Sequence, residues 1–75
     1  MRFVEAKRIA MDRMSANGIE IVDSVEYVED GVATFAVEVP RSQAETAMDA
    51  MRPVFCVGCH VDDDGFAKVY GELEQ

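Results

Sequence analysis

The first apolar pattern along the chain has the period of an α-helix. Its apolar positions recur every three or four residues and form one broad arc: Phe3, Ala6, Ile9, Ala10, Met11 and Met14. Asn17 and Gly18 follow, and glycine readily takes the left-handed conformation that ends many helices. We therefore predict a helix over Phe3–Ala16.

Two stretches with alternating apolar and polar residues come next and predict a β-hairpin. The apolar positions of the first stretch are Ile19, Ile21, Val25 and Tyr27. Asp23 interrupts this apolar side, which suggests a bulge near Val22-Asp23. Asp30-Gly31 is a strong signal for a tight turn between the two strands. The returning strand has its apolar positions at Ala33, Phe35, Val37 and Val39.

A second helix and a second hairpin are predicted in the remaining half. Ser42 and Glu45 have the spacing of a capping box, and Pro53 marks the end of the helix. The apolar stripe between them consists of Ala44, Ala47, Met48 and Met51. We then expect a strand over Val54–Val61, a turn at Asp62–Gly65 and a last strand over Phe66–Leu73.

The two halves of the chain match each other. Ala10–Met14 resembles Ala47–Met51 at an offset of 37 positions, and Glu29–Phe35 resembles Asp63–Val69 at an offset of 34. These matches predict an α+β fold with a duplicated αββ unit, in which two helices pack on one face of a four-stranded antiparallel sheet. We expect a single domain over 1–75, with its repeat units at 3–39 and 40–73. The strand order stays open, because two such hairpins can pair by more than one edge.

The repeat also predicts which side chains face the helices. These are Ala33, Phe35, Val37 and Val39, with their counterparts Ala67, Val69, Gly71 and Leu73. The opposite, open face then carries Val32, Thr34, Ala36, Glu38, Phe66, Lys68, Tyr70 and Glu72. By strand parity we also place Glu20, Val22, Ser24, Glu26 and Val28 on the open face, together with Val54, Cys56 and His60.

Charge narrows the range of functions. The chain of 75 residues has 15 acidic and 7 basic side chains, a formal net charge of −8, and 49% hydrophobic residues. This hydrophobic fraction is too high for a disordered acidic tail, and the negative charge disfavours direct binding to nucleic acid or to a membrane. Lys68 is the only basic residue in Ile19–Val39 and Val54–Gln75, so the excess of carboxylates lies on the hairpins.

The first residues of the sequence bear on where the protein is located in the cell. Charged side chains appear there before any apolar run long enough for a secretory signal. We therefore expect a cytoplasmic protein, and in that compartment Cys56 and Cys59 stay reduced thiols.

Cys56, Cys59 and His60 match the C-x-x-C-H pattern of c-type haem attachment. That chemistry requires export, and the motif normally opens a helix, whereas here it lies in a predicted strand. The same residues, with Asp62, could bind zinc, but a continuous strand places Cys59 on the face opposite the other two. Redox-active C-x-x-C pairs usually lie at a helix amino terminus, which this motif lacks. Cys59 is therefore interpreted as a small core residue, and no metal or cofactor is expected.

The acidic turn Asp62–Gly65 invites comparison with a calcium-binding loop. If Gly65 is the sixth position of an EF-hand, His60 is the first and Gly71 the twelfth, where Asp and Glu are required. The turn is therefore interpreted as a solvated hairpin turn. His60 is the only histidine and no nucleophile has a base partner at motif spacing, so we do not expect an enzyme.

Two classes of function remain. The first is a non-catalytic module that binds a basic protein surface, in particular one that binds nucleic acid. The residues expected to contact the partner are Glu20, Glu26, Glu38, Asp62, Asp63, Asp64, Phe66, Tyr70 and Glu72. Small acidic phage inhibitors, including anti-CRISPR and anti-restriction proteins, work in this way as a class, and the chain shares their size and charge. The second class is a homo-oligomeric structural or regulatory protein that dimerises through the open sheet face and buries Phe66 and Tyr70 against a second copy. A metal or redox site at Cys56, Cys59 and His60 is a weaker alternative.

Overall fold

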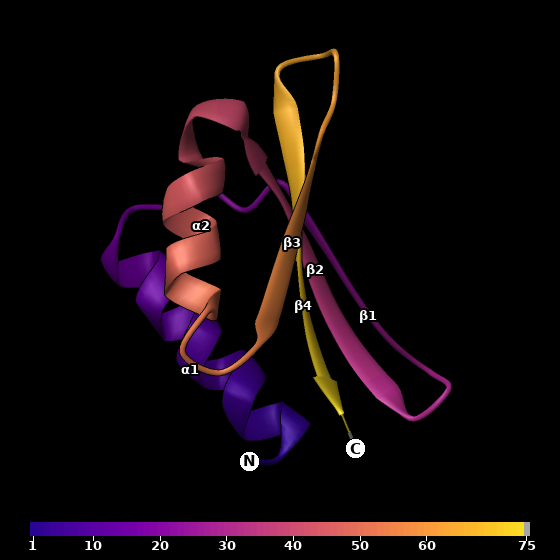
Figure 1. Ribbon diagram of the computed structural model, residues 1–75. Helices are drawn as coiled ribbons and strands as arrows, with labels where there is room; N and C mark the ends of the chain where they lie inside the picture. The colour runs from indigo at the N-terminus through magenta and orange to yellow at the C-terminus, as the bar shows by residue number, and fades with distance from the viewer. Residues whose placement is uncertain (75) are drawn as a thin grey trace.

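Two helices cover one face of a four-stranded antiparallel sheet, which makes this an α+β protein (Figure 1). The computed structural model describes residues 1–74. The elements along the chain are α1 (Phe3–Ala16), β1 (Asp23–Glu29), β2 (Val32–Pro40), a short 3-10 helix η1 (Arg41–Gln43), α2 (Ala44–Met51), β3 (Cys56–Val61) and β4 (Phe66–Glu74). Within residues 1–74, no helix is long and apolar enough to cross a membrane.

Helix α1 has the predicted bounds. Ala6, Ala10 and Met14 are fully buried, as the helical period requires of one face. The helix ends where Gly18 adopts a φ of +67°, and the N–H of Ile19 donates to the carbonyl of Met14 at 3.0 Å. This backbone hydrogen bond satisfies one of the last carbonyls of the helix.

The first hairpin has the predicted two-residue turn. Asp30 and Gly31 have φ values of +53° and +77°, the combination that a type I′ turn requires. On β2, the predicted helix-facing residues are all buried: Ala33, Phe35, Val37 and Val39. Thr34 and Ala36 are buried too, but they lie outside the core cluster that contains Phe35, Val37 and Val39, so the alternation assigns the faces correctly.

The start of α2 differs from the prediction. The chain passes from Pro40 directly into η1, so that Ser42 lies inside this turn and Gln43 occupies the cap position without a capping side-chain hydrogen bond. The predicted capping box of Ser42 and Glu45 is therefore wrong. The Gln43 side chain instead accepts from the N–H of Glu20 at 2.8 Å and donates to the carbonyl of Gly18 at 3.2 Å.

Strand β3 begins later than predicted. Val54 and Phe55 belong to the turn after α2, where the N–H groups of both residues donate to the carbonyl of Met51. Val54 packs against the core, so its predicted place on the open face is wrong. Phe55 is buried against the rings of Phe3 and Phe35, at centroid distances of 6.0 and 6.4 Å.

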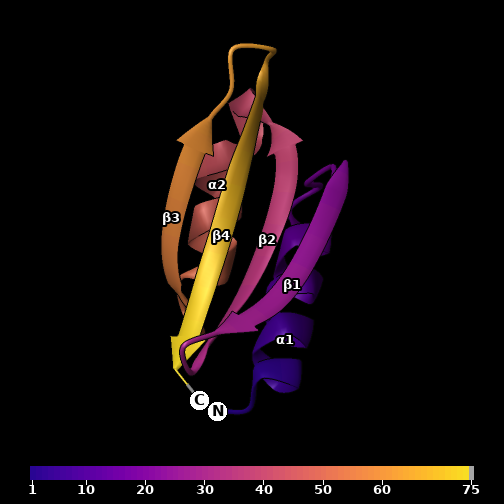
Figure 2. The same cartoon turned by 90° about the vertical axis from the view of Figure 1, so that its right-hand side faces the viewer.

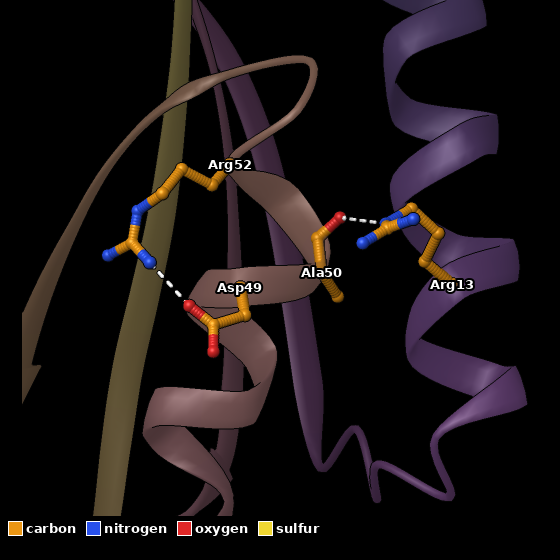
Figure 3. Close-up of polar contacts among 4 residues, drawn as sticks. All are labelled: Arg13, Asp49, Ala50 and Arg52. Atoms are coloured by element: carbon orange, nitrogen blue, oxygen red, sulfur yellow. Dashed lines mark hydrogen bonds and ion pairs between the residues drawn. The ribbon is translucent and has the colours of Figure 1, made fainter.

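Polar contacts link the two helices near the end of α2 (Figure 3). The Nε of Arg13 in α1 donates to the carbonyl of Ala50 at 2.9 Å, and this carbonyl is among the last in α2. Such carbonyls have no partner within their own helix, so the arginine supplies the missing donor. Arg52, directly after α2, pairs with Asp49.

The strand order is β1-β2-β4-β3, so the two return strands β2 and β4 lie at the centre (Figure 2). They pair antiparallel along their whole length, from Val32 opposite Glu74 to Pro40 opposite Phe66. The core lies between this central pair and the helices, and β1 and β3 form the two edges of the sheet.

Candidate functional site

The register of the sheet arranges the side chains of the open face in rows. Cross-strand partners point to the same side of a sheet, so each row can be followed from β1 to β3. The rows are Asp23–Glu38–Lys68–His60, then Val25–Ala36–Tyr70–Gly58, then Tyr27–Thr34–Glu72–Cys56, and finally Glu29–Val32–Glu74, which ends at β4. Figure 2 looks onto this face, with the helices behind the sheet.

An apolar row crosses the middle of the open face, and we refer to Val25, Ala36, Tyr70 and Gly58 as the central strip. Ala36 is only 5% exposed although no helix covers this face, so neighbouring side chains of the sheet itself must shield it. Tyr70 is half-buried and its ring lies over Gly58, where an added Cβ atom would come within 2.5 Å of the ring carbons. The ring therefore has a defined place in the strip.

Exposed residues of β1 carry the apolar surface to the edge of the sheet. Val25 is 53% exposed and Tyr27, in the adjacent row, is 52% exposed. The sequence pattern placed both on the core side, and that prediction is wrong. The reason is that Ile19 and Ile21 pack against the core before β1 begins at Asp23, and the alternation does not continue through this point. The polar residue Asp23 interrupts the series of apolar positions, and this interruption was the available signal for the change of side.

The same change of side corrects the predicted positions of Ser24, Glu26 and Val28. These residues lie on the helix side of β1, since Glu26 is opposite the buried Phe35. The Nζ of Lys7 in α1 lies 2.7 Å from the Glu26 carboxylate and 5.5 Å from the centroid of the Phe35 ring. Glu26 is thus paired across the helix–sheet interface and does not belong to the open face.

Carboxylates flank the central strip on both sides. Asp23 and Glu38 lie in the row on one side, and Glu72 lies in the row on the other side. One row further, the end of the sheet carries Glu29 and Glu74, which are both exposed. Lys68 and His60 are the two residues of these rows that can carry a positive charge, so the described face has a strong excess of acidic groups.

The other predicted contact residues are spread over the molecule. Glu20 precedes β1 in a loop, and Phe66 is half-buried at the end of β4 opposite Pro40. Asp62, Asp63 and Asp64 form the turn of the second hairpin, closed by the N–H of Asp62 donating to the carbonyl of Phe66 at 2.8 Å. Of the predicted set, the four residues that the structure places on the open face are Glu38, Phe66, Tyr70 and Glu72.

The C-x-x-C-H residues lie in a regular strand, as predicted. Cys56 and His60 are opposite Glu72 and Lys68 on the open face, whereas Cys59 lies on the helix side and packs against the core. Both thiols are free. In the described part of the chain, no group of three or more histidine, cysteine or acidic residues is arranged to hold a metal ion.

Comparisons with known proteins do not add a family assignment. No protein-family model, curated protein or solved structure gives a significant match to the chain. A function must therefore be inferred from the surface of the protein itself.

Proposed function

We propose that the protein is a non-catalytic binding module whose acidic open face docks onto a basic protein surface. One observation carries this proposal: an apolar strip with a fixed tyrosine ring crosses the face between carboxylates, with Asp23 and Glu38 on one side and Glu72 on the other. Protein interfaces commonly have an aromatic and apolar centre with a polar rim. A rim of carboxylates selects a partner whose own rim carries lysine and arginine.

The partner that fits this surface best is a nucleic-acid-binding site. Glu38 and Glu72 are separated by four residues along the strands, because Glu38 is opposite Lys68. At about 3.3 Å per residue Glu38 and Glu72 are about 13 Å apart along the strand direction, similar to the roughly 12 Å width of the DNA major groove. Carboxylates in this arrangement can take positions that phosphates otherwise occupy, and the net charge of −8 accelerates the encounter.

We therefore assign the protein to the type of small phage inhibitor that blocks CRISPR or restriction complexes, acting in the cytoplasm. The assignment rests on size, charge and the geometry of the open face.

The test uses two triple variants with the same net charge. One reverses open-face carboxylates (Asp23→Lys, Glu38→Lys and Glu72→Lys), and the control reverses exposed helix carboxylates (Glu5→Lys, Asp12→Lys and Glu45→Lys). Each reversal adds two charges, so both variants change from −8 to −2. Each protein is titrated into purified CRISPR effector complexes and restriction endonucleases, and DNA binding by the target is followed by fluorescence anisotropy.

We expect wild type and the helix variant to compete with DNA for one of these targets, and the open-face variant to bind about 100-fold more weakly. Equal inhibition by both variants, inhibition that does not compete with DNA, or no effect on any target would contradict the proposal.

We also infer that the two halves descend from one αββ unit. In support, equivalent residues at the offset of 37 are fully buried in both helices, namely Ala10 with Ala47 and Met14 with Met51. The turns differ by one residue, because Val28 is opposite Ala33 and Val61 is opposite Ala67. A chain made of two copies of residues 40–73 should fold into a four-stranded sheet, and a disordered circular dichroism spectrum would contradict the inference.

A further inference from the structure

Strand β1 is an edge strand whose residues are all exposed. Its seven residues pair only with β2, and no strand of residues 1–74 lies on its outer side. The exposed fractions of its larger apolar side chains are high, at 53% for Val25, 52% for Tyr27 and 66% for Val28. An open strand of this kind is a template for pairing with another strand.

The turn geometry determines which backbone groups point outward. In a two-residue turn, the flanking residues Glu29 and Val32 form the first hydrogen-bonded pair, and every second pair follows the same pattern. Ser24, Glu26 and Val28 therefore direct their N–H and C=O groups away from β2. The N–H of Ser24 donates to the carboxylate of Asp23 at 2.9 Å. Glu26 and Val28 are left as outward donors.

The charges along β1 discriminate between possible partners. Asp23, Glu26, Glu29 and Asp30 lie within eight residues and no basic residue occurs between Ile19 and Val39, although Glu26 is paired with Lys7 of α1. A second copy of the chain would bring the same carboxylates against this strand, and like charges on opposed strands are destabilising. A strand that carries lysine or arginine is attracted by the same groups.

We propose that β1 is a strand-addition site for an extended basic segment of the partner. This proposal rests on the proposed function and adds the mode of recognition. The added strand would place basic residues opposite Asp23 and Glu29 and apolar residues opposite Val25 and Tyr27, while its alternate residues face the helix side. Main-chain hydrogen bonds to Glu26 and Val28 would supply part of the affinity.

The other edge strand does not offer this combination. Strand β3 has no carboxylate between Cys56 and Val61, and its residues Val57 and Cys59 pack against the core. Val61 is the one large apolar residue of β3 that is exposed, at 44%, whereas Val25, Tyr27 and Val28 of β1 are all more than half exposed.

The test uses a peptide with the sequence Lys-Thr-Val-Thr-Val-Thr-Lys, in which basic and apolar residues have the predicted spacing. The control peptide has glutamate in place of both lysines. Each peptide is titrated into isotope-labelled protein, and amide hydrogen exchange is measured by NMR. We expect the lysine peptide to bind at least about tenfold more tightly at low salt and to slow exchange of the Glu26 and Val28 amides, with a smaller difference between peptides at high salt.

Two proline variants locate the binding edge. Val28→Pro removes an outward N–H from β1, whereas Val61→Pro removes one from β3, because the Asp62 N–H already points toward β4. We expect Val28→Pro to weaken binding of the lysine peptide at least tenfold and Val61→Pro to leave it unchanged. Circular dichroism is used to check that both variants fold, and the exchange measurement on wild type does not depend on either variant.

The possible outcomes separate this proposal from the proposed function. Equal affinity for both peptides, or no protection of Glu26 and Val28, would overturn strand addition. If light scattering shows a dimer and these amides are already protected without peptide, a second copy of the chain occupies the outer edge of β1 instead. The open-face reversals could abolish DNA-competitive inhibition while Val28→Pro leaves it unaffected. That result would overturn the edge site alone and leave the proposed function in place.

Discussion

At the scale of single residues, Gly58 and Tyr70 form the most specific contact of the open face. The ring of Tyr70 lies where a side chain at position 58 would otherwise be, and this fixes an aromatic group that is only half-buried. Packing an aromatic ring over a glycine in a neighbouring strand stabilises the pair and removes the disadvantage of glycine in a strand. The absence of a side chain at Gly58 thus helps to shape the open face.

The contact predicts the effect of Gly58→Ala. The new Cβ would lie 2.5 Å from the ring, so Tyr70 must move toward solvent, and we expect a loss of about 1–2 kcal/mol in the free energy of unfolding. Urea denaturation measures the loss. In a Tyr70→Ala background the same substitution should be nearly neutral, because nothing then opposes the methyl group. A similar loss in both backgrounds would contradict this account of the contact.

At the scale of elements, the start of α2 depends on Gln43 and not on Ser42. The Gln43 side chain bridges to Glu20 and Gly18, and so attaches the α1–β1 loop to the first turn of α2. We expect Gln43→Ala to lower the free energy of unfolding by about 1 kcal/mol, because two backbone groups lose their partner. Ser42→Ala is the matched control and should change it by less than about 0.5 kcal/mol. A larger effect for Ser42→Ala would indicate a capping role after all.

The elements also show where sequence patterns suffice and where they do not. Helix α1 could be predicted to the residue, since its period and Gly18 both act locally. The start of α2 could not, because Pro40 leads directly into a 3-10 turn and moves Ser42 away from the cap. The faces of β2 and β4 followed from alternation and from the repeat.

The side chains of β1 were assigned to the wrong sides because the alternation changes phase between Ile21 and Val25. Asp23 signals the interruption in the sequence, and the pairing with β2 shows which side each residue of β1 takes. The candidate site was therefore half predictable: Glu38, Tyr70 and Glu72 followed from the pattern, whereas Asp23, Val25 and Tyr27 required the register.

At the scale of the whole molecule, charge is divided between the two layers. Six of the seven basic residues lie in or beside the helices, namely Arg2, Lys7, Arg8, Arg13, Arg41 and Arg52. The sheet and its turns carry most of the carboxylates, so one layer of a small molecule is strongly negative. Repulsion among the carboxylates of that layer opposes folding. The same carboxylates produce a negative field that attracts positively charged groups.

This distribution predicts that salt stabilises the fold. The radius of gyration is 11.4 Å. The screening length falls from about 30 Å at 0.01 M salt to about 10 Å at 0.1 M, so the carboxylates repel one another across the whole sheet only at low salt. We expect Tm to rise by about 4–8 °C over this range, which corresponds to about 1 kcal/mol.

The open-face triple variant should show a smaller rise in Tm than the helix triple variant, although both have the same net charge. Calorimetry at several salt concentrations provides the measurement. Identical salt dependence of the two variants would show that net charge matters and its location does not.

The strand order has a consequence for how the chain reaches its fold. Strand β4 is the last element along the chain but occupies a central place, so β2 cannot complete its ladder until Phe66–Glu74 has left the ribosome. Until that moment the first hairpin has an unpaired inner edge, because β2 lacks its partner strand. Folding must therefore follow synthesis of the last strand, and closure between distant strands makes it slower than the folding of a helical bundle of this size. An unpaired strand edge of this kind makes an incomplete chain more prone to aggregation than the folded molecule.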